Sequence, residues 1–369
     1  MVDVRSQYLK IKQEVDAGIQ EVIDSCAFIN GPAVKAFKKS LEDYLGVSTV
    51  IPCANGTDAL QIAMMALGLQ PGDEVIVPAF TYVATAEVIA LLGLTPVMVD
   101  VDPDSFNITA DIVKAAITDK TKAVVPVNLF GQNADLEEIM ELATAHDFYV
   151  IEDNAQAIGS DYKMKDGTTK KSGSIGHIGS TSFYPSKNLG AYGDGGALYT
   201  NDPVLGERMR QVANHGQSRK YVHDLIGCNS RLDSIQAAIL NVKLRHLDSY
   251  ASARQEVADR YDAAFIKHDQ LQIPKRMEHS THVFHQYTLR VLDGSRDQLK
   301  EYLAERGIPS MIYYPIPLYK QEAFKSFTKV THLPVTEQLC LEVLSLPIHT
   351  EMTIDQINTI TQAVSSFYN

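Results

Sequence analysis

The sequence predicts an α/β protein with a large, mainly parallel sheet covered by helices on both faces, followed by a smaller α+β domain. Short apolar, β-rich runs alternate with helix-like stretches through the first part of the chain, which is typical of strands joined by crossover helices. The pattern changes after about residue 250, and 369 residues, 45% of them hydrophobic, suffice for a major and a minor domain. We therefore expect a large domain over 1–250 and a small one over 251–369.

Five apolar runs are the expected strands of the large sheet, at 75–77, 96–99, 123–126, 149–151 and 181–183. The stretches with helical spacing lie at 57–68, 82–92, 109–117 and 134–146. Ligands of such sheets bind beyond the carboxyl ends of the strands. The residues that follow each apolar run are therefore the first candidates for a functional site.

The remaining segments predict the smaller domain and one surface feature. Residues 235–268 are expected to form one long, charge-laced amphipathic helix. Beyond it we expect strands at 285–291 and 311–314 and helices at 295–306 and 353–367. The polar, basic segment 163–175 is expected to be a surface loop or hairpin. Its lysines could attract a nucleotide diphosphate, but a solvated surface is the simpler interpretation.

Charge and cysteine usage exclude several classes of protein. A net charge of -12 argues against binding nucleic acid or an anionic membrane face, although a site can still be locally positive. No apolar run has the length of a membrane-spanning helix, and the start of the chain lacks the core of a signal peptide. Cys26, Cys53, Cys228 and Cys340 have no metal-like spacing and fit free thiols. We expect a cytoplasmic protein without a metal.

Lys187 is the most informative candidate for chemistry. It lies between a short β-like run and the glycine-dense segment 188–196, where α/β enzymes often place functional side chains. A lysine there can form a Schiff base with a carbonyl once its pKa is lowered. A single lysine is more often an exposed surface residue, so the interpretation depends on the motifs upstream.

One of these motifs predicts an anion site. Gly56 and Thr57 follow an apolar run and open a helix, whose free amide groups favour a phosphate. An ordinary helix cap is the alternative, and Asp58 could itself take the place of the anion. Ser182, just before Lys187, is either a further phosphate contact or simply a strand hydroxyl.

Two further residues complete a set of chemical groups. Asp153 comes directly after a buried run and can pair with a cation above the sheet edge, although a metal or a structural cap is also open. Tyr82 can stack on a flat ring or simply pack in the core. A phosphate cradle, an aromatic face, an acid and an amine are together what pyridoxal 5′-phosphate (PLP) requires.

A series of motifs runs in fixed order along nearly the whole chain, at 28–32, 54–60, 72–75, 80–85, 100–102, 129–131, 152–156, 182–187, 193–196, 214–216, 229–233 and 314–317. In this order the chain resembles the DegT/DnrJ/EryC1/StrS family of sugar aminotransferases. The resemblance implies a PLP-dependent transferase of fold type I, the aspartate aminotransferase fold.

The resemblance also implies a role for each candidate around the cofactor ring. Lys187 is expected to bind the cofactor covalently and to act as the general base, and Asp153 to pair with the pyridinium nitrogen. Gln156 is expected to contact the phenolic oxygen of the ring, and Tyr82 to stack on its face. Some relatives carry histidine in place of the lysine and are dehydratases, so Lys187 favours transamination over a lyase or dehydratase.

The phosphate and the second subunit follow from the same resemblance. Gly56, Thr57 and Ser182 are expected to hold the phosphate, and Asn229 matches an asparagine that the family contributes from a second subunit. We therefore expect a homodimer with shared active sites. L-glutamate is the expected amino donor, leaving 2-oxoglutarate and pyridoxamine phosphate, and a nucleotide-linked keto-sugar is the expected acceptor.

Segment 183–196 resembles the branch that aminates carbon 3, whereas carbon-4 enzymes commonly show a Gly-Glu-Gly-Gly version of 193–196. The most similar substrates are UDP-2-acetamido-2-deoxy-3-oxo-glucuronate and then dTDP-3-keto-6-deoxyhexoses, for surface polysaccharide biosynthesis. Arg231 can hold a carboxylate or phosphate of the substrate or form an ion pair with Asp233. Tyr313 and Tyr314 are expected to face the sugar, and relatives often have histidine at the first of these positions. A non-catalytic PLP-binding regulator is the alternative from another class.

Overall fold

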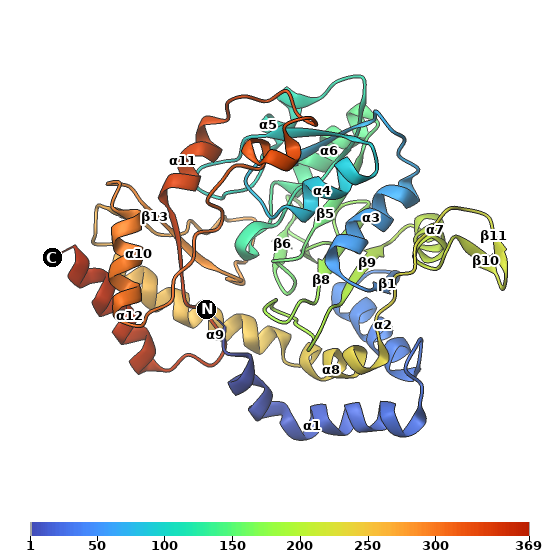
Figure 1. Cartoon of the computed structure of the whole chain (residues 1–369), viewed down its shortest axis with the longest axis horizontal. Coiled ribbons are helices and arrows are strands. Elements are labelled where there is room, and N and C mark those ends of the chain that lie inside the picture. The colour runs from blue at the N-terminus through green and yellow to red at the C-terminus, as the bar shows by residue number, and fades with distance from the viewer. Residues whose placement is uncertain (1, 369) are drawn as a thin grey trace.

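A seven-stranded sheet organises the N-terminal two thirds of the chain. The structure, a computed structural model, describes residues 2–368. The strand order is β1-β9-β8-β5-β4-β2-β3 (Figure 1). The bounds are β1 (Thr49–Cys53), β2 (Glu74–Pro78), β3 (Thr95–Val99), β4 (Thr121–Val124), β5 (Tyr149–Asp153), β8 (Ile178–Ser182) and β9 (Gly196–Thr200).

Six of the seven strands point the same way, because β9 alone is antiparallel to both of its neighbours, β1 and β8. The pairs β3–β2, β2–β4, β4–β5 and β5–β8 are parallel. The five predicted runs overlap β2, β3, β4, β5 and β8, and the mainly parallel sheet is confirmed. The carboxyl ends of these strands therefore meet at one edge.

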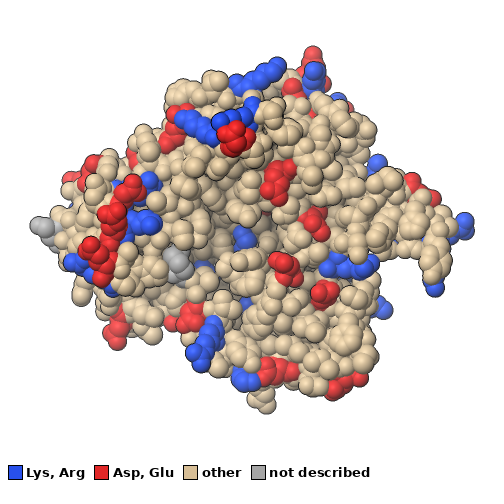
Figure 2. All heavy atoms as spheres, viewed as in Figure 1, with Lys and Arg blue, Asp and Glu red and all other residues tan. Residues whose placement is uncertain are grey.

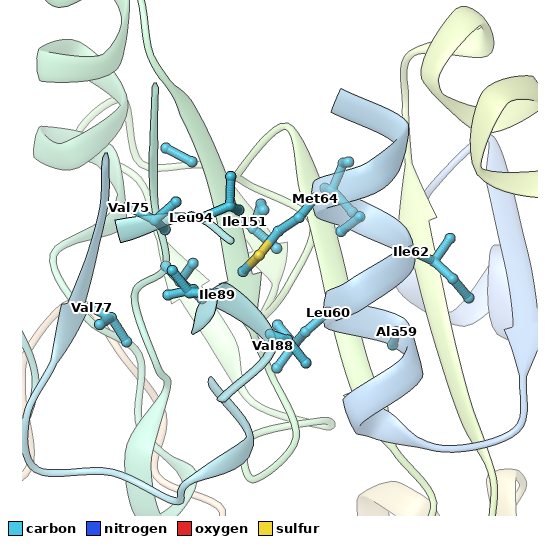
Figure 3. Packing of buried hydrophobic residues seen from close by; sticks show 14 of the residues in the cluster. Ala59, Leu60, Ile62, Met64, Val75, Val77, Val88, Ile89, Leu94 and Ile151 are labelled. Atoms are coloured by element: carbon cyan, nitrogen blue, oxygen red, sulfur yellow. The ribbon is translucent and has the colours of Figure 1, made fainter. Parts of the chain in front are cut away.

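Helices cover both faces of this sheet, as predicted. One face carries α3 (Gly56–Leu67), α4 (Ala84–Leu91) and α7 (Pro203–Ala213); the other carries α2 (Pro32–Leu45), α5 (Ala110–Ala116), α6 (Leu136–His146) and α8 (Ser234–Leu244). Alternation along β2 sends Val75 and Val77 into the first layer and Ile76 into the second. Figure 3 shows Leu60 and Met64 of α3 in the first layer. Each such fully buried side chain contributes about 1.5–3 kcal/mol.

The predicted helices of this part are found within a few residues of their expected ends. Polar residues cap their starts: the Asn55 side chain accepts from the amide of Asp58 at 2.8 Å, and Thr109 caps α5 in the same way. The long helix α1 (Val4–Ser25) was not predicted. It lies along α8, with Ile11 and Val15 packed against Ile239 (Figure 1).

The smaller α+β part has a three-stranded antiparallel sheet in the order β12-β13-β14. Its elements are α9 (Leu247–Phe265), β12 (Leu271–Gln272), β13 (Tyr287–Val291), α10 (Arg296–Glu305), β14 (Val343–Leu346) and α12 (Ile354–Phe367). The strand expected at 285–291 and the helices expected at 295–306 and 353–367 are confirmed as β13, α10 and α12.

Two predictions in this region are wrong. The single helix expected over 235–268 is divided at Arg245 and His246, because α8 packs against the large sheet whereas most of α9 packs in the small core. The strand expected at 311–314 is only an isolated bridge between Met311 and Ser345. Beyond it the chain turns away, and the ring of Tyr314 packs 5.9 Å from that of Phe80.

The segment between β13 and β14 returns to the large sheet. It contains η2 (Leu318–Lys320), η3 (Glu322–Phe324) and α11 (Pro334–Glu342), and one further short helix, η1 (Leu129–Gly131), lies in the large part. Leu318 and Phe324 pack in the same cluster as α3 and α4. A division into 1–250 and 251–369 therefore remains a proposal, in which the second unit reaches over the first.

Two short hairpins lie outside the seven-stranded sheet. The segment 163–175 contains β7 of the hairpin formed by β6 (Asp161–Lys163) and β7 (Thr169–Lys171), so the hairpin expected there is confirmed. A second hairpin, β10 (Gln217–Arg219) with β11 (Val222–His223), projects from the body of the molecule (Figure 1). Within residues 2–368, no helix has both the length and the apolar character needed to span a bilayer.

Candidate active site

The predicted site residues follow the carboxyl ends of the parallel strands. Gly56 comes after β1, Tyr82 after β2, Asp153 at the end of β5, and Ser182 and Lys187 at and beyond the end of β8. Since these strands point the same way, their ends bring the five residues to one edge of the sheet. In the space-filling view the visible face is hollowed near its centre, and acidic and basic side chains are mixed around it (Figure 2).

Lys187 lies in the short connection between β8 and β9. Its amide donates to the carbonyl of Tyr184 at 2.8 Å, and the amide of Ala191 closes the loop by donating to the carbonyl of Phe183 at 2.7 Å. The side chain is half-buried. Burial lowers the pKa of Lys187 to about 8, and the negative charge of Asp153 partly opposes this fall. The uncharged form, which a nucleophile requires, is therefore more populated near neutral pH than in an ordinary lysine.

The lowered pKa predicts how the reactivity of Lys187 depends on pH. Only the uncharged amine attacks a carbonyl, so its rate of reaction with a small aldehyde should reach half of its maximum near pH 8. An ordinary lysine would do so near pH 10.4. Borohydride trapping followed by peptide mass spectrometry measures this for each lysine of the cofactor-free protein. A half-maximum above pH 10 at Lys187 would contradict the prediction.

Asp153 is a buried carboxylate held in one orientation. Its Oδ2 accepts a hydrogen bond from the hydroxyl of Thr85 at 2.7 Å, and its Oδ1 accepts from the amide of Ala155 at 3.1 Å. Burial raises the pKa of Asp153, while the bond from Thr85 opposes that rise. A cation placed above this carboxylate would offset the penalty of burying its charge. Among residues 2–368 no group of three or more histidine, cysteine or acidic side chains could hold a metal.

The start of α3 leaves backbone donors free. The Asn55 side chain accepts the hydrogen bond of the Asp58 amide. The amides of Gly56 and Thr57 have no acceptor within the described residues. Asp58 does not take the place of an anion, because its carboxylate accepts from the hydroxyl of Ser230 at 2.6 Å. Free amides at a helix start are suited to a phosphate.

Gly56 is required by the close approach of α3 to β8. A Cβ atom at this position would lie 2.7 Å from the Cβ of Ser182, so any side chain would displace the strand or the helix. The hydroxyl of Ser182 stays next to the free amides and accepts from the amide of Tyr184 at 3.2 Å. The pattern of free amides, small residue and hydroxyl fits the phosphate of PLP.

Gln156 and Tyr314 are connected to each other. The Oε1 of Gln156 accepts from the amide of Phe130 at 2.8 Å, which orients its Nε2 to donate to the hydroxyl of Tyr314 at 3.2 Å. Burial raises the pKa of Tyr314. Tyr82 is 58% exposed, so its ring is accessible to a flat ligand. Tyr313 is half-buried and lines a small pocket with Ser186 and His285.

Asn229 and Arg231 lie beyond the β10–β11 hairpin and on either side of Ser230. The hydroxyl of Ser230 accepts from the amide of Ala54 at 3.0 Å, so this segment contacts the start of α3 in the same chain. Asn229 is exposed. Arg231 is half-buried and makes no ion pair within residues 2–368, so the pairing with Asp233 that we had left open is not observed.

Sequence reasoning missed two residues of the site. Thr85 orients the carboxylate of Asp153. In the sequence, the one feature that pointed to Thr85 was its position in the helix that follows β2. His285 is buried with its Nδ1 3.3 Å from the Oδ1 of Asn188, the residue after Lys187. Burial and the charge of Lys187 hold the pKa of His285 well below its ordinary value, so it stays neutral. Nothing in the sequence distinguished it from the other histidines.

Two solved structures with this fold point to the same chemistry. A DegT DnrJ EryC1 StrS aminotransferase from Brucella abortus superposes with a TM-score of 0.95 and 41% identity, over 100% of this chain and 99% of that one. NtdA from Bacillus subtilis, solved with bound cofactor PMP, superposes with a TM-score of 0.90 and 31% identity, over 97% of this chain and 82% of that one. The protein is thus a PLP-dependent aminotransferase.

The family is shown by the sequence itself. The model of the DegT/DnrJ/EryC1/StrS aminotransferase family matches residues 9–365, and the chain belongs to that family. UDP-2-acetamido-2-deoxy-3-oxo-D-glucuronate aminotransferase of Pseudomonas aeruginosa is 44% identical over 99% of both chains. A pleiotropic regulatory protein of Geobacillus stearothermophilus is also 44% identical, over 100% of this chain and 98% of its own length. UDP-N-acetyl-3-dehydro-alpha-D-glucosamine 3-aminotransferase of Acidithiobacillus ferrooxidans is 43% identical over 99% and 96%.

Proposed function

We propose that this aminotransferase moves an amino group from L-glutamate to carbon 3 of a nucleotide-linked 3-keto sugar, with UDP-2-acetamido-2-deoxy-3-oxo-glucuronate as the first candidate and a dTDP-3-keto-6-deoxyhexose as the second. The product would serve surface polysaccharide biosynthesis. The observation that carries the chemistry is the half-buried amine of Lys187 at the sheet edge shared with Asp153 and the free amides of α3. The choice of sugar is supported by relatives that act on UDP-linked 3-keto sugars.

The chain's own residues divide the work of the reaction. When bound, PLP supplies an aldehyde for amines and a ring that withdraws electrons. The amides of Gly56 and Thr57, with the Ser182 hydroxyl, would hold the phosphate, and the carboxylate of Asp153 would keep the ring nitrogen protonated by pairing with its positive charge. The Nζ of Lys187 would take a proton from the α-carbon of the amino donor and, in the second half of the reaction, would deliver a proton to the sugar carbon that receives the amine.

The donor and acceptor are selected by the remaining candidates. Gln156 is fixed by the amide of Phe130 and is proposed to orient the cofactor ring from its phenolic side, with Tyr82 on one face. Arg231, which has no acidic partner among the described residues, is proposed to bind a carboxylate or phosphate of the substrate. Tyr313 and Tyr314 are proposed to face the sugar.

A homodimer is part of the proposal. Asn229 is exposed next to a hairpin that projects from the body of the molecule (Figure 1). An exposed amide at such a place is available to a second copy of the chain, where it would complete the phosphate site. Arg231 lies two residues further on and would reach the same neighbouring site.

The experiment is a screen of keto-sugars with the purified, PLP-loaded protein. We expect L-glutamate to bleach the visible absorbance of the bound cofactor and a UDP-linked 3-keto sugar to restore it, with the mass change that replaces a keto oxygen by an amine. Acceptance of carbon-4 keto-sugars alone would contradict the proposed position of transfer. Release of water without amine transfer would indicate a dehydratase.

A PLP-binding regulator is the second candidate, because one of the most similar relatives carries a regulatory name. The net charge of -12 does not favour direct contact with DNA. Binding of the cofactor without any bleaching by glutamate or other amino acids would support this candidate over the aminotransferase.

A further inference from the structure

Lys243 is a buried ammonium group without an acidic partner. It lies on α8, is 1% exposed, and makes no ion pair within residues 2–368. Burying an unpaired charge is costly, and lysine is almost never fully buried unless paired. Such a residue needs an explanation that packing does not supply, because an aliphatic side chain of similar length would fill the same space at lower cost.

The hydrogen bond that Lys243 makes leads directly to the loop of Lys187. Its Nζ donates to the carbonyl of Gly190 at 2.6 Å and lies 5.2 Å from the ring centre of Tyr192. Gly190 is three residues beyond Lys187 and is tightly enclosed, since a Cβ there would lie 2.4 Å from the carbonyl oxygen of Pro185. The ammonium group of Lys243 therefore fixes the tightly packed part of the Lys187 loop at Gly190, downstream of the point where the chain leaves β8.

A second contact from α8 strengthens the same attachment. The Oε1 of Gln236 accepts from the amide of Tyr192 at 2.8 Å. α8 is itself held between α1 and α2 (Figure 1). The loop is thus connected to a helix that is rigid because it is packed on two sides, and Lys243 supplies the only charged contact in that connection within the described residues.

A second attachment of the loop leads to the segment 283–285. Asn188 donates to the carbonyl of Val283 at 3.4 Å and contacts His285. Arg254, 4% exposed, donates through Nη1 to the carbonyls of Phe284 and His285 at 3.1 and 3.3 Å, again with no carboxylate partner within residues 2–368. A carbonyl of the loop and carbonyls of the segment that the loop contacts are therefore bound by buried basic side chains.

We propose that Lys243 is a positioning residue for Lys187: its buried ammonium group, bound to the carbonyl of Gly190, holds the Lys187 loop against α8 in the geometry needed for proton transfer. The proposal rests on the proposed role of Lys187. It follows that removing the charge and the donor at position 243 slows the chemistry of Lys187 without changing how tightly substrates bind.

The test compares Lys243→Met with wild type in full-length protein. A reactive amine displaced by about 1 Å can lose about 100-fold in rate. We expect covalent attachment of added PLP to Lys187, trapped by borohydride and located by peptide mass spectrometry, to slow by about 10- to 100-fold. In the loaded enzyme we expect kcat with L-glutamate to fall by a similar factor while KM changes less than about 3-fold. Lys243→Arg, which keeps charge and donors, should recover part of both rates.

Val242→Ala is the matched control. Val242 is the preceding residue on α8 and is buried in the apolar cluster that α8 forms with α1, which also includes Tyr192 of the loop. Its apolar side chain cannot donate a hydrogen bond to the loop, so this control removes packing without removing the donor. It should lower the melting temperature but leave the rate of attachment at Lys187 unchanged. Should Lys243→Met fail to fold, Lys243→Gln carries the same comparison.

Two outcomes would overturn the inference. One is a Lys243 variant that loses stability as Val242→Ala does yet attaches PLP at the wild-type rate. The other is a Lys243→Met enzyme whose KM for L-glutamate rises while its kcat stays at the wild-type value. If PLP attaches to wild-type protein at a lysine other than 187, the proposed function fails, so the two failures are distinguishable.

Discussion

Lys187→Ala should abolish amine transfer. The variant lacks both the amine that binds the cofactor aldehyde and the base that moves the α-proton, and general base catalysis alone contributes about 100- to 10,000-fold. We expect kcat/KM to fall by at least about 1,000-fold and the visible absorbance of covalently bound cofactor to disappear. The fold should be retained, because the half-buried side chain makes no hydrogen bond to other described residues.

The measurement is the half-reaction with L-glutamate, followed by absorbance, together with product mass after addition of the keto-sugar. Lys163→Ala, at an exposed position on β6, is the matched control and should behave as wild type. A Lys187→Ala protein that turns over as fast as wild type would remove the basis of the proposed mechanism.

Asp153→Asn is the change with the next largest expected effect. The amide keeps the shape of the carboxylate but cannot pair as an anion with a protonated ring nitrogen. Removal of one preorganised electrostatic contact in an active site typically costs about 100- to 1,000-fold in kcat. We expect a loss in this range with a small change in the affinity for PLP, since the phosphate contacts at α3 remain.

The thermal stability of the cofactor-free Asp153→Asn protein should not fall with its activity. Because burial raises the pKa of Asp153, folding without cofactor carries a penalty for the charged form of this side chain, and a neutral amide removes that penalty. The melting temperature of cofactor-free Asp153→Asn should therefore equal or exceed that of wild type at pH 7. Asp135→Asn, at a half-buried carboxylate whose pKa burial also raises, is the control, and its activity should be unchanged. An Asp153→Asn enzyme with wild-type activity would contradict the proposed pairing of Asp153 with the ring nitrogen of the cofactor.

The part of the fold that the sequence predicts is the part governed by simple periodicity. The strands β2 to β5 are short apolar runs that alternate with helices, so their positions in the sequence and their parallel direction follow from general rules. The break between α8 and α9 was missed because Arg245 and His246 carry no glycine or proline signal. The change of direction is caused by the two cores that the helices join, which are formed by residues far apart in the sequence.

The same distinction applies to the site. Positions at strand ends, such as Asp153 and Lys187, could be anticipated because a parallel sheet collects them at one edge. The bond from Thr85 to Asp153 depends on the rotation of α4 about its axis, and the burial of Lys243 depends on how α8 meets the loop. Neither is encoded in local spacing, and a lysine on an amphipathic helix ordinarily indicates a solvated face.

The reversed strand β9 has a consequence for how this scaffold can diversify. Because β9 is the antiparallel neighbour of β8, the chain leaves and re-enters the sheet at adjacent positions, and the reactive amine is carried on a short closed connection. Tyr313 and Tyr314 belong to a segment more than a hundred residues further along the sequence, which is anchored on the small sheet through Met311. With Tyr313 and Tyr314 facing the sugar as we propose, exchange of that distant segment would change which acceptor is admitted while the nitrogen-transferring centre stays where it is.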